Sequence, residues 1–213
     1  MQQIDLGLSQ KTETLVLDAD QSDSESSATV QYHPGFIDDN QASGLYHTLS
    51  SLVEWQEETL WIAGKERKVP RLIAWYGDKD AEYQYSGKSH QPMPWIRPLA
   101  LLKEQLEKEL TTSFNSVLCN LYRNGQDSMG WHADNEKELG DNPVIASVSL
   151  GATRKFQLKH KTNSQLRHKM LLTSGSLLVM QGTTQDYWLH QVPKELKVNE
   201  PRINLTFRNI IES

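Results

Sequence analysis

The chain has 213 residues, of which 37% are apolar and 23% charged, as expected of a globular protein of one or two domains with a sizeable core. Its longest apolar runs, such as residues 177–180, are far shorter than the ~20 residues of a membrane helix, which excludes a helical span. The single cysteine, Cys119, excludes an internal disulfide and favours an intracellular location, cytoplasmic in a bacterium and nuclear or cytoplasmic in a eukaryote.

The first 30 residues differ from the rest of the chain in charge. They hold six acidic residues and one lysine, so they account for the whole net charge of −5. They lack the basic start and apolar middle of a secretory signal. The stretch Gln21–Val30 is rich in serine and acidic residues, a composition that buries too little apolar surface to offset chain entropy. We therefore predict a flexible or loosely attached tail over residues 1–30 and one folded domain over residues 31–213.

Two helices are predicted in the first half of the chain. Apolar residues recur at three- and four-residue steps from Ala42 to Val53, and Asp38 or Asp39 can cap the first turn. A second helix follows Pro98, with leucines at positions 99, 102, 106 and 110 along one face. Both helices are amphipathic and are expected to pack one face against a core.

Strands are predicted for the rest of the chain. Residues 70–85, between the helices, are rich in aromatic side chains and are broken by Gly77 and Asp78, which is typical of a hairpin or loop. After residue 112, the predicted strands are 114–122, 144–150, 155–160, 170–172, 176–180, 187–191 and 202–209. Many short strands after two helices predict a mainly β protein, a barrel or jelly roll with helices packed outside it.

The segment 154–169 carries four lysines and two arginines without an acidic residue. Such a run is typical of a solvated face. It is also typical of a surface that contacts phosphates, because clustered lysine and arginine side chains release counterions from a nucleic-acid backbone. The sequence leaves both alternatives open.

The last predicted strand alternates strictly between polar and apolar residues. Its period of two places Arg202, Asn204, Thr206 and Arg208 on one face and three apolar side chains on the other. One interpretation is an edge strand whose charged face lies in water. The other is an anion pocket inside the barrel, where the two arginines bind opposite ends of a small dicarboxylate.

His132 and Asp134 face the same way on an extended segment, and His190 follows Asp134 after 56 positions. Two imidazoles and a carboxylate can hold a metal and leave coordination positions open for reactants. A His-x-Asp motif alone is a weak signal, and each histidine could instead be a hydrogen-bonded structural residue. The order of His-x-Asp, a later histidine and then the double-arginine strand favours the metal site.

This order resembles the Fe(II)- and 2-oxoglutarate-dependent dioxygenases, and the flanking residues are similar to those of the AlkB family of nucleic-acid dealkylases. The matching segments are Pro70-Arg71, 76–78, 83–87, 120–122, 131–136, 145–152, 175–180, His190 and 201–208. The resemblance implies a double-stranded β-helix, or jelly roll, over residues 113–213 and helices with nucleotide-recognition hairpins over residues 31–112. It also implies a monomer that binds alkylated DNA or RNA and no membrane.

The resemblance implies that His132, Asp134 and His190 bind Fe(II) as a facial triad, with 2-oxoglutarate as cosubstrate. The implied reaction is oxidative demethylation of bases such as 1-methyladenine and 3-methylcytosine, with release of succinate, CO₂ and formaldehyde. Two alternatives remain. One is a nucleic-acid-binding module without catalysis, which the presence of all three ligands and both arginines argues against. The other is the same oxidation of protein or lipid.

For the cosubstrate, the resemblance implies that Arg202 pairs with the distal carboxylate of 2-oxoglutarate, helped by Tyr122 and Asn204. Arg208 and Asn120 would attend the end that chelates the metal. The chemistry agrees, because a guanidinium fork suits a carboxylate and a neighbouring hydroxyl or amide satisfies its remaining lone pairs.

For the substrate, the implied contacts are Arg71, Tyr76, Tyr83, Tyr85 and Glu136. Tyr85 and the ring of His132 would sandwich a base taken out of the stack, and Glu136 would accept a hydrogen bond from its exocyclic amine. The alternative role of Tyr83 and Tyr85 is cross-strand packing. Duplex-acting relatives place a wedge near residues 61–63, but Ala63 is too small to fill the gap of a flipped base, so single strands are the expected substrate.

Overall fold

The computed structural model describes residues 12–17, 27–62, 64–81, 83–85 and 88–211, with only the backbone described at residues 60–62, 83–85 and 88–90. The elements in chain order are β1 (Glu13–Leu17), β2 (Ala28–His33), α1 (Asp39–Leu52), β3 (Gln56–Ile62), β4 (Lys65–Gly77), β5 (Tyr83–Tyr85), β6 (Lys88–His90), α2 (Arg97–Leu110), β7 (Ser116–Tyr122), β8 (Met129–His132), η1 (Lys137–Leu139), β9 (Ile145–Gly151), β10 (Arg154–His160), β11 (Arg167–Leu172), β12 (Ser176–Gln181), α3 (Thr184–Tyr187), β13 (Trp188–Val192) and β14 (Arg202–Arg208).

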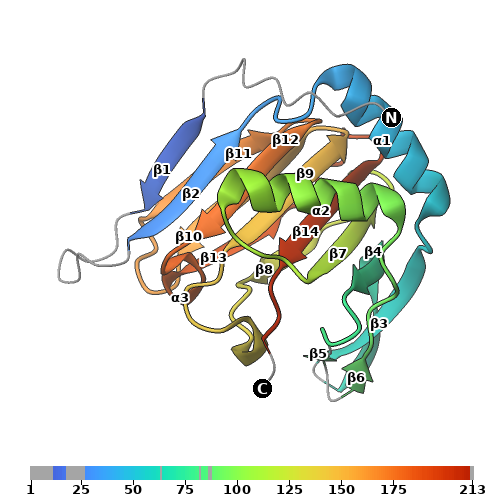
Figure 1. Cartoon of the computed structure of the whole chain (residues 1–213). Helices are drawn as coiled ribbons and strands as arrows, with labels where there is room; N and C mark the ends of the chain where they lie inside the picture. The colour runs from blue at the N-terminus through green and yellow to red at the C-terminus, as the bar shows by residue number, and fades with distance from the viewer. Residues whose placement is uncertain (1–11, 18–26, 63, 82, 86–87, 212–213) are drawn as a thin grey trace.

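Two antiparallel sheets form the body of the molecule (Figure 1). The large sheet has the order β1-β2-β12-β9-β14-β7-β4-β3, and the small sheet has the order β11-β10-β13-β8. One apolar cluster lies between the sheets and includes Leu178 from β12 and Phe156 from β10. This arrangement confirms the predicted mainly β, jelly-roll fold.

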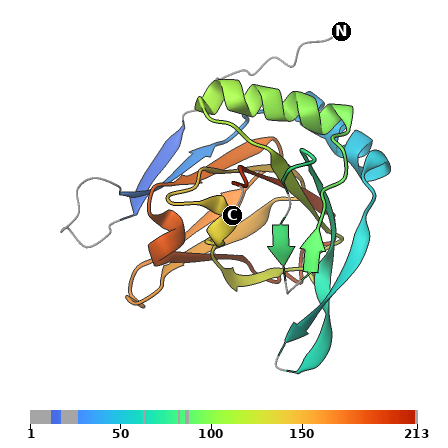
Figure 2. The same cartoon turned by 60° about the horizontal axis from the view of Figure 1, so that its bottom comes forward.

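Helices α1 and α2 cover the outer side of the large sheet, while the short β5–β6 pair lies at the end of the barrel that faces the viewer in Figure 2. The Asp38 carboxylate caps α1 by accepting a hydrogen bond from the Gln41 backbone N–H at 3.0 Å. Leu99, Leu102 and Leu106 of α2 are fully buried, and each such leucine contributes about 1.5–3 kcal/mol of burial energy. Both predicted helices are confirmed. In the described part of the chain, no helix has the length and apolar character needed to cross a membrane.

The N-terminal region contributes two strands to the large sheet. β1 pairs with β2, and β2 pairs with β12, with Val30 opposite Met180. Leu17, Ala28 and Val30 are buried in the core between the sheets. The prediction of a flexible tail is therefore wrong for residues 13–17 and 28–30, because their apolar side chains are buried when these strands pair at the edge of the large sheet. Residues 1–11 and 18–26 lie outside the described residues.

The segment predicted as a hairpin or loop, residues 70–85, holds strands at both of its ends: residues 70–77 belong to β4 of the large sheet, and residues 83–85 form β5, paired with β6. β4 is a 13-residue strand that pairs with β3 on one side and β7 on the other, so it joins the first half of the chain to the barrel. Gly77 ends β4 where a Cβ atom would lie 2.7 Å from the Asn115 carbonyl oxygen. β8 was not predicted, since four residues at a sheet edge give little periodic signal.

Candidate active site

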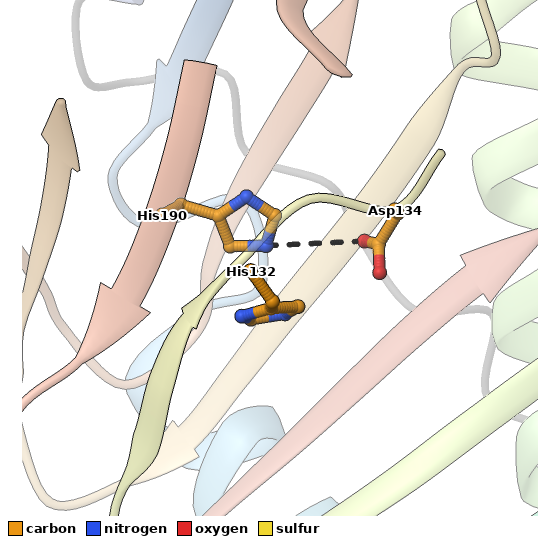
Figure 3. Close-up of side chains that lie close together, drawn as sticks. All are labelled: His132, Asp134 and His190. Atoms are coloured by element: carbon orange, nitrogen blue, oxygen red, sulfur yellow. Dashed lines mark ion pairs between the residues drawn. The ribbon is translucent and has the colours of Figure 1, made fainter. Parts of the chain in front are cut away.

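The metal-binding candidates meet at the inner face of the small sheet. His132 ends β8 and lies directly opposite His190 of the neighbouring β13, which explains how distant residues come together. One ligand atom from each of His132, Asp134 and His190 lies within 4.8 Å of the others. Figure 3 shows the two imidazoles and the carboxylate close together, with His190 Nε2 3.9 Å from Asp134 Oδ2.

The two histidines are prepared for metal binding in different ways. His132 Nδ1 lies 2.9 Å from the Gly130 carbonyl oxygen, so it carries the proton that donates to this oxygen and leaves Nε2 free for a metal. Burial, together with the neighbouring His132, lowers the pKa of His190 to about 3. His190 is therefore uncharged at neutral pH, which is the form that binds metals.

Asp134 is held in place through its carboxylate and through its backbone. Arg208 Nη2 donates to Asp134 Oδ1 at 2.7 Å, and the Asp134 backbone N–H donates to Gln185 Oε1 at 2.9 Å. Burial alone would raise the pKa of Asp134, but electrostatic interactions, with Arg208 first and then with the rings of His190 and His132, together outweigh it and hold the pKa below its ordinary value. The carboxylate is thus ionised, and Oδ2 faces His190.

A pocket extends from the three candidate ligands into the space between the sheets. Its lining residues are Leu118, Asn120, Tyr122, Met129, His132, Asp134, Ser147, Phe156, Met180, His190, Val192, Asn204, Thr206 and Arg208. Apolar side chains from both sheets surround the polar groups, which is the composition expected of a small-molecule site.

Arg202 is fully buried and contacts two residues that line this pocket, Asn204 and Tyr122. Its Nη2 donates to Ser149 Oγ at 2.9 Å and to Asn204 Oδ1 at 2.7 Å, and its guanidinium carbon lies 5.2 Å from the centre of the Tyr122 ring. Nε and Nη1 have no hydrogen-bond partner among the described residues. Burial lowers the pKa of Arg202 to about 10, so it remains a cation at neutral pH.

A buried cation with two unused donors is costly unless an anion completes it. A carboxylate of 2-oxoglutarate fits this site, because a guanidinium can donate two parallel hydrogen bonds to it. β14 pairs with β9 and β7 along both edges, so the interpretation of an exposed edge strand is wrong. The polar face of β14 lies inside the barrel, as the alternative interpretation requires, and the binding of a dicarboxylate by its two arginines stays a prediction.

Two residues predicted to contact the substrate, Arg71 and Tyr76, lie on opposite faces of β4. Arg71 is buried, and its Nε donates to Asn120 Oδ1 at 2.6 Å, so it supports the pocket wall. Tyr76 lies in the core under the helices and its hydroxyl accepts a hydrogen bond from the Glu54 backbone. Tyr76 is on the opposite face of β4 from Arg71, so the prediction that it contacts substrate is wrong.

Two residues of the predicted substrate site, Tyr83 and Tyr85, lie on β5, paired with β6; their side chains are outside the described atoms. Glu136 immediately precedes η1, and its Oε2 is buried without a hydrogen-bond partner among the described residues. Sequence reasoning missed Ser149 and Gln185. The alternation of Ser147 and Ser149 in β9 could have indicated the first, whereas nothing local marks Gln185 as a partner of Asp134.

Comparisons with known proteins agree with this geometry. The sequence profile of the 2OG-Fe(II) oxygenase superfamily matches residues 29–208. The chain is 44% identical to the alpha-ketoglutarate-dependent dioxygenase alkB homolog 3 of Bos taurus over 186 residues, which cover 83% of this chain and 64% of that protein. It is 38% identical to the DNA oxidative demethylase ALKBH2 of Homo sapiens over 181 residues, or 80% of this chain and 69% of that protein.

A solved structure, that of OsALKBH1, shares the fold with a TM-score of 0.61 at 17% identity, covering 84% of this chain and 96% of that chain. The alkB homolog 3 proteins of cattle and humans are longer than the matched region. The chain spans 64% of the cattle protein and 65% of the human protein.

Proposed function

The chain belongs to the AlkB family of the 2OG-Fe(II) oxygenase superfamily, and from this premise we propose that it oxidatively demethylates N-alkylated bases in nucleic acid. One observation carries the proposal: a His-Asp-His cluster lines a pocket, and a buried, incompletely bonded arginine contacts the pocket-lining residues Tyr122 and Asn204. Relatives at 38–44% identity are named as an alpha-ketoglutarate-dependent dioxygenase and a DNA oxidative demethylase, which supports the same chemistry here.

The side chains present suit Fe(II) and 2-oxoglutarate. His132, Asp134 and His190 would hold the metal and leave positions open for reactants. Arg202 would bind the distal carboxylate of 2-oxoglutarate through its free donors, with Ser149 and Asn204 fixing its orientation. When bound, the metal and the cosubstrate supply the oxidising chemistry that no side chain provides.

The protein's own contribution is positioning and exclusion of water. Arg208 fixes the Asp134 carboxylate, and Asn120 would attend the metal-chelating end of the cosubstrate from a position that Arg71 holds. Phe156 stacks on the His190 ring at 5.4 Å between centroids and screens it from solvent. Such a dry, pre-arranged pocket strengthens every electrostatic contact inside it.

The substrate class follows from the same premise. We infer alkylated single-stranded DNA or RNA, with a base held near His132, Tyr85 and Glu136. The Oε2 atom of Glu136 has no hydrogen-bond partner among the described residues, and a carboxylate suits a positively charged methylated base. Ala63, on which the single-strand preference depends, lies outside the described residues. We further propose an intracellular monomer, since a lone buried cysteine suits a reducing compartment.

The direct test supplies the protein with Fe(II), 2-oxoglutarate, air and a single-stranded oligonucleotide carrying 3-methylcytosine. We expect formaldehyde and the unmodified base in equal amounts, and no turnover with any methylated oligonucleotide would contradict the proposal. His132→Ala should abolish turnover and iron retention, whereas His47→Ala, at an exposed position on α1, should change neither. A nucleic-acid-binding module without catalysis would show no difference between these variants and the wild type.

The oxidation of protein or lipid makes a different prediction. Phosphate contacts release counterions, so affinity for a nucleic-acid substrate must fall as salt rises. Affinity for methylated oligonucleotides that stays constant between low and high salt would therefore favour the alternative substrates.

A further inference from the structure

The outer face of the small sheet has an unusual composition. None of its four strands, β11, β10, β13 and β8, contains an aspartate or a glutamate. On β10, Phe156 and Leu158 face the core, so Lys155 and Lys159, which flank them in the strand, face outward. On β11, Arg167 and Lys169 are exposed. The face that lies opposite the pocket is therefore basic.

Three of these cations lack neutralising partners. Among the described residues, no carboxylate lies within ion-pair distance of Lys159, Arg167 or Lys169. Lys159 and Arg167 are also directly opposite each other in the β10–β11 ladder. Like charges in this position destabilise a sheet, so the arrangement gains nothing for the fold itself. Unfavourable local arrangements of this kind are expected at functional sites, and an anion bound between the two cations would remove their repulsion.

Two other cations of the 154–169 segment have partners that account for them. Arg154 is buried and bonded to backbone carbonyls, and Lys155 Nζ lies 3.1 Å from Glu195 Oε1. Lys161 Nζ donates to the Gln185 carbonyl oxygen at 3.0 Å, and Arg167 Nε donates to the Ser164 carbonyl oxygen at 2.9 Å, but a carbonyl oxygen leaves the charge of a cation in place. Among the described residues, the charge without a carboxylate partner therefore lies on Lys159, Arg167 and Lys169 of the sheet, with Lys161 just after β10.

The same face carries an aromatic side chain next to the active site. Lys159 Nζ lies 4.4 Å from the centre of the Trp131 ring, on β8 at the far edge of the sheet. Trp131 immediately precedes the metal-binding candidate His132. At ~4.8 Å per strand, four strands make a surface about 15 Å across, enough for several phosphates of an extended strand. A strand lying on it would lead toward the pocket.

We propose that this basic face, formed by Lys159, Arg167, Lys169 and Trp131, binds the phosphate backbone of the single strand that flanks the base in the pocket. The inference rests on the proposed function, which supplies the nucleic-acid substrate. Cations spaced along a surface beside an aromatic ring are the combination that binds single strands without sequence preference.

The test compares two variants with the same change in charge. Lys159→Gln/Arg167→Gln alters the basic face, and Arg97→Gln/Lys108→Gln removes one exposed arginine and one exposed lysine from α2. Binding of an unmodified single-stranded oligonucleotide of about 15 nucleotides is measured by fluorescence anisotropy over a series of salt concentrations. Thermal melting of each variant verifies that it is folded.

We expect the basic-face variant to bind at least ~10-fold more weakly at low salt, with a plot of log affinity against log salt shallower by about 1.4, or ~0.7 for each lost phosphate contact. The α2 variant should keep the wild-type slope. Equal losses in both variants, or no loss in either, would overturn the proposal. So would polyglutamate that binds the wild type as tightly as the oligonucleotide, since an acidic protein would then be the partner.

This binding assay needs no catalysis, so its outcome is separate from that of the proposed function. If the wild type fails to demethylate a methylated trinucleotide but the basic-face variant binds the oligonucleotide more weakly than the wild type, only the proposed enzymatic function is refuted. A wild type that demethylates the trinucleotide while the basic-face variant binds normally refutes only the basic face.

Discussion

Two buried arginines lie beside the same tyrosine ring and have opposite hydrogen-bonding states. The guanidinium carbons of Arg154 and Arg202 lie 5.5 Å and 5.2 Å from the centre of the Tyr122 ring. Arg154 donates to the carbonyl oxygens of Asn124, Asp127 and Pro193 and pairs with Glu195. Arg202 uses only Nη2, and two of its nitrogens remain without partners among the described residues.

The difference separates a structural cation from a ligand-binding one. A buried arginine that satisfies several loops stabilises the fold, because each backbone carbonyl it bonds would otherwise be buried without a donor. A buried arginine with unused donors lowers stability until an anion arrives. Burial alone could not distinguish the two residues, since both are at most 1% exposed.

The largest expected effect is on stability at Arg154. Arg154→Leu leaves three carbonyl oxygens without their donor and removes one of the partners of the Glu195 carboxylate, so we expect a loss of about 3–5 kcal/mol in the free energy of unfolding. Urea unfolding with and without 2-oxoglutarate measures it, and the loss should be the same in both. A loss below ~1 kcal/mol would mean that Arg154 is not the structural member of the pair.

Arg202→Leu should act on ligand binding instead. We expect 2-oxoglutarate to bind about 30- to 1000-fold more weakly, since truncating one member of a buried charge pair costs ~2–5 kcal/mol. Iron affinity should change little, because Arg202 touches none of the three candidate ligands. Calorimetric titration with each ligand makes the comparison, and an equal loss of both affinities would contradict the assigned role.

The Tyr122 ring contacts both arginines, so we expect its removal to change both the stability of the fold and the affinity for the cosubstrate. Tyr122→Leu removes a cation–π contact from each guanidinium, so we expect a moderate loss, about 0.5–2 kcal/mol, in unfolding free energy and a weaker cosubstrate affinity as well. Tyr122→Phe keeps the ring and is the matched control. If only one of the two properties changes in Tyr122→Leu, the two arginines are independent.

The smallest expected effect is on the pH dependence of stability, through Glu195, the ion-pair partner of Arg154. Burial opposes the charge of Glu195, but hydrogen bonds from Lys155 and the charges of Lys155 and Arg154 lower its pKa. A lowered folded-state pKa stabilises the fold above the ordinary glutamate pKa, and the contribution is lost as pH falls through the folded-state value. Glu195→Gln should therefore flatten the acid limb of stability by less than ~1 kcal/mol, measured by urea unfolding between pH 6 and pH 3. The exposed Glu200→Gln should leave the limb unchanged.

The local periodicity of the sequence determined many of the helices and strands of this protein and the direction of their side chains. The two helices, seven strands of the second half and the polar face of β14 follow from spacings of three to four residues or of two, because side-chain direction repeats with the backbone. The same alternation in β10, where Arg154 shares a face with Phe156 and Leu158, could also have indicated that Arg154 is buried. The order of His132, Asp134, His190 and Arg202 predicted the site and its chemistry.

Only the tertiary structure decided which strands become neighbours. β2 gains its stability from β12, and β4 from β7, so the start of the chain and the segment at residues 70–77 could not be assigned from their own composition. The same pairing turned Tyr76 toward the helices and Arg71 toward the pocket. It also gave Arg154 a full set of hydrogen-bond partners and left Arg202 incomplete, because partners come from whichever distant backbone groups the sheets bring close.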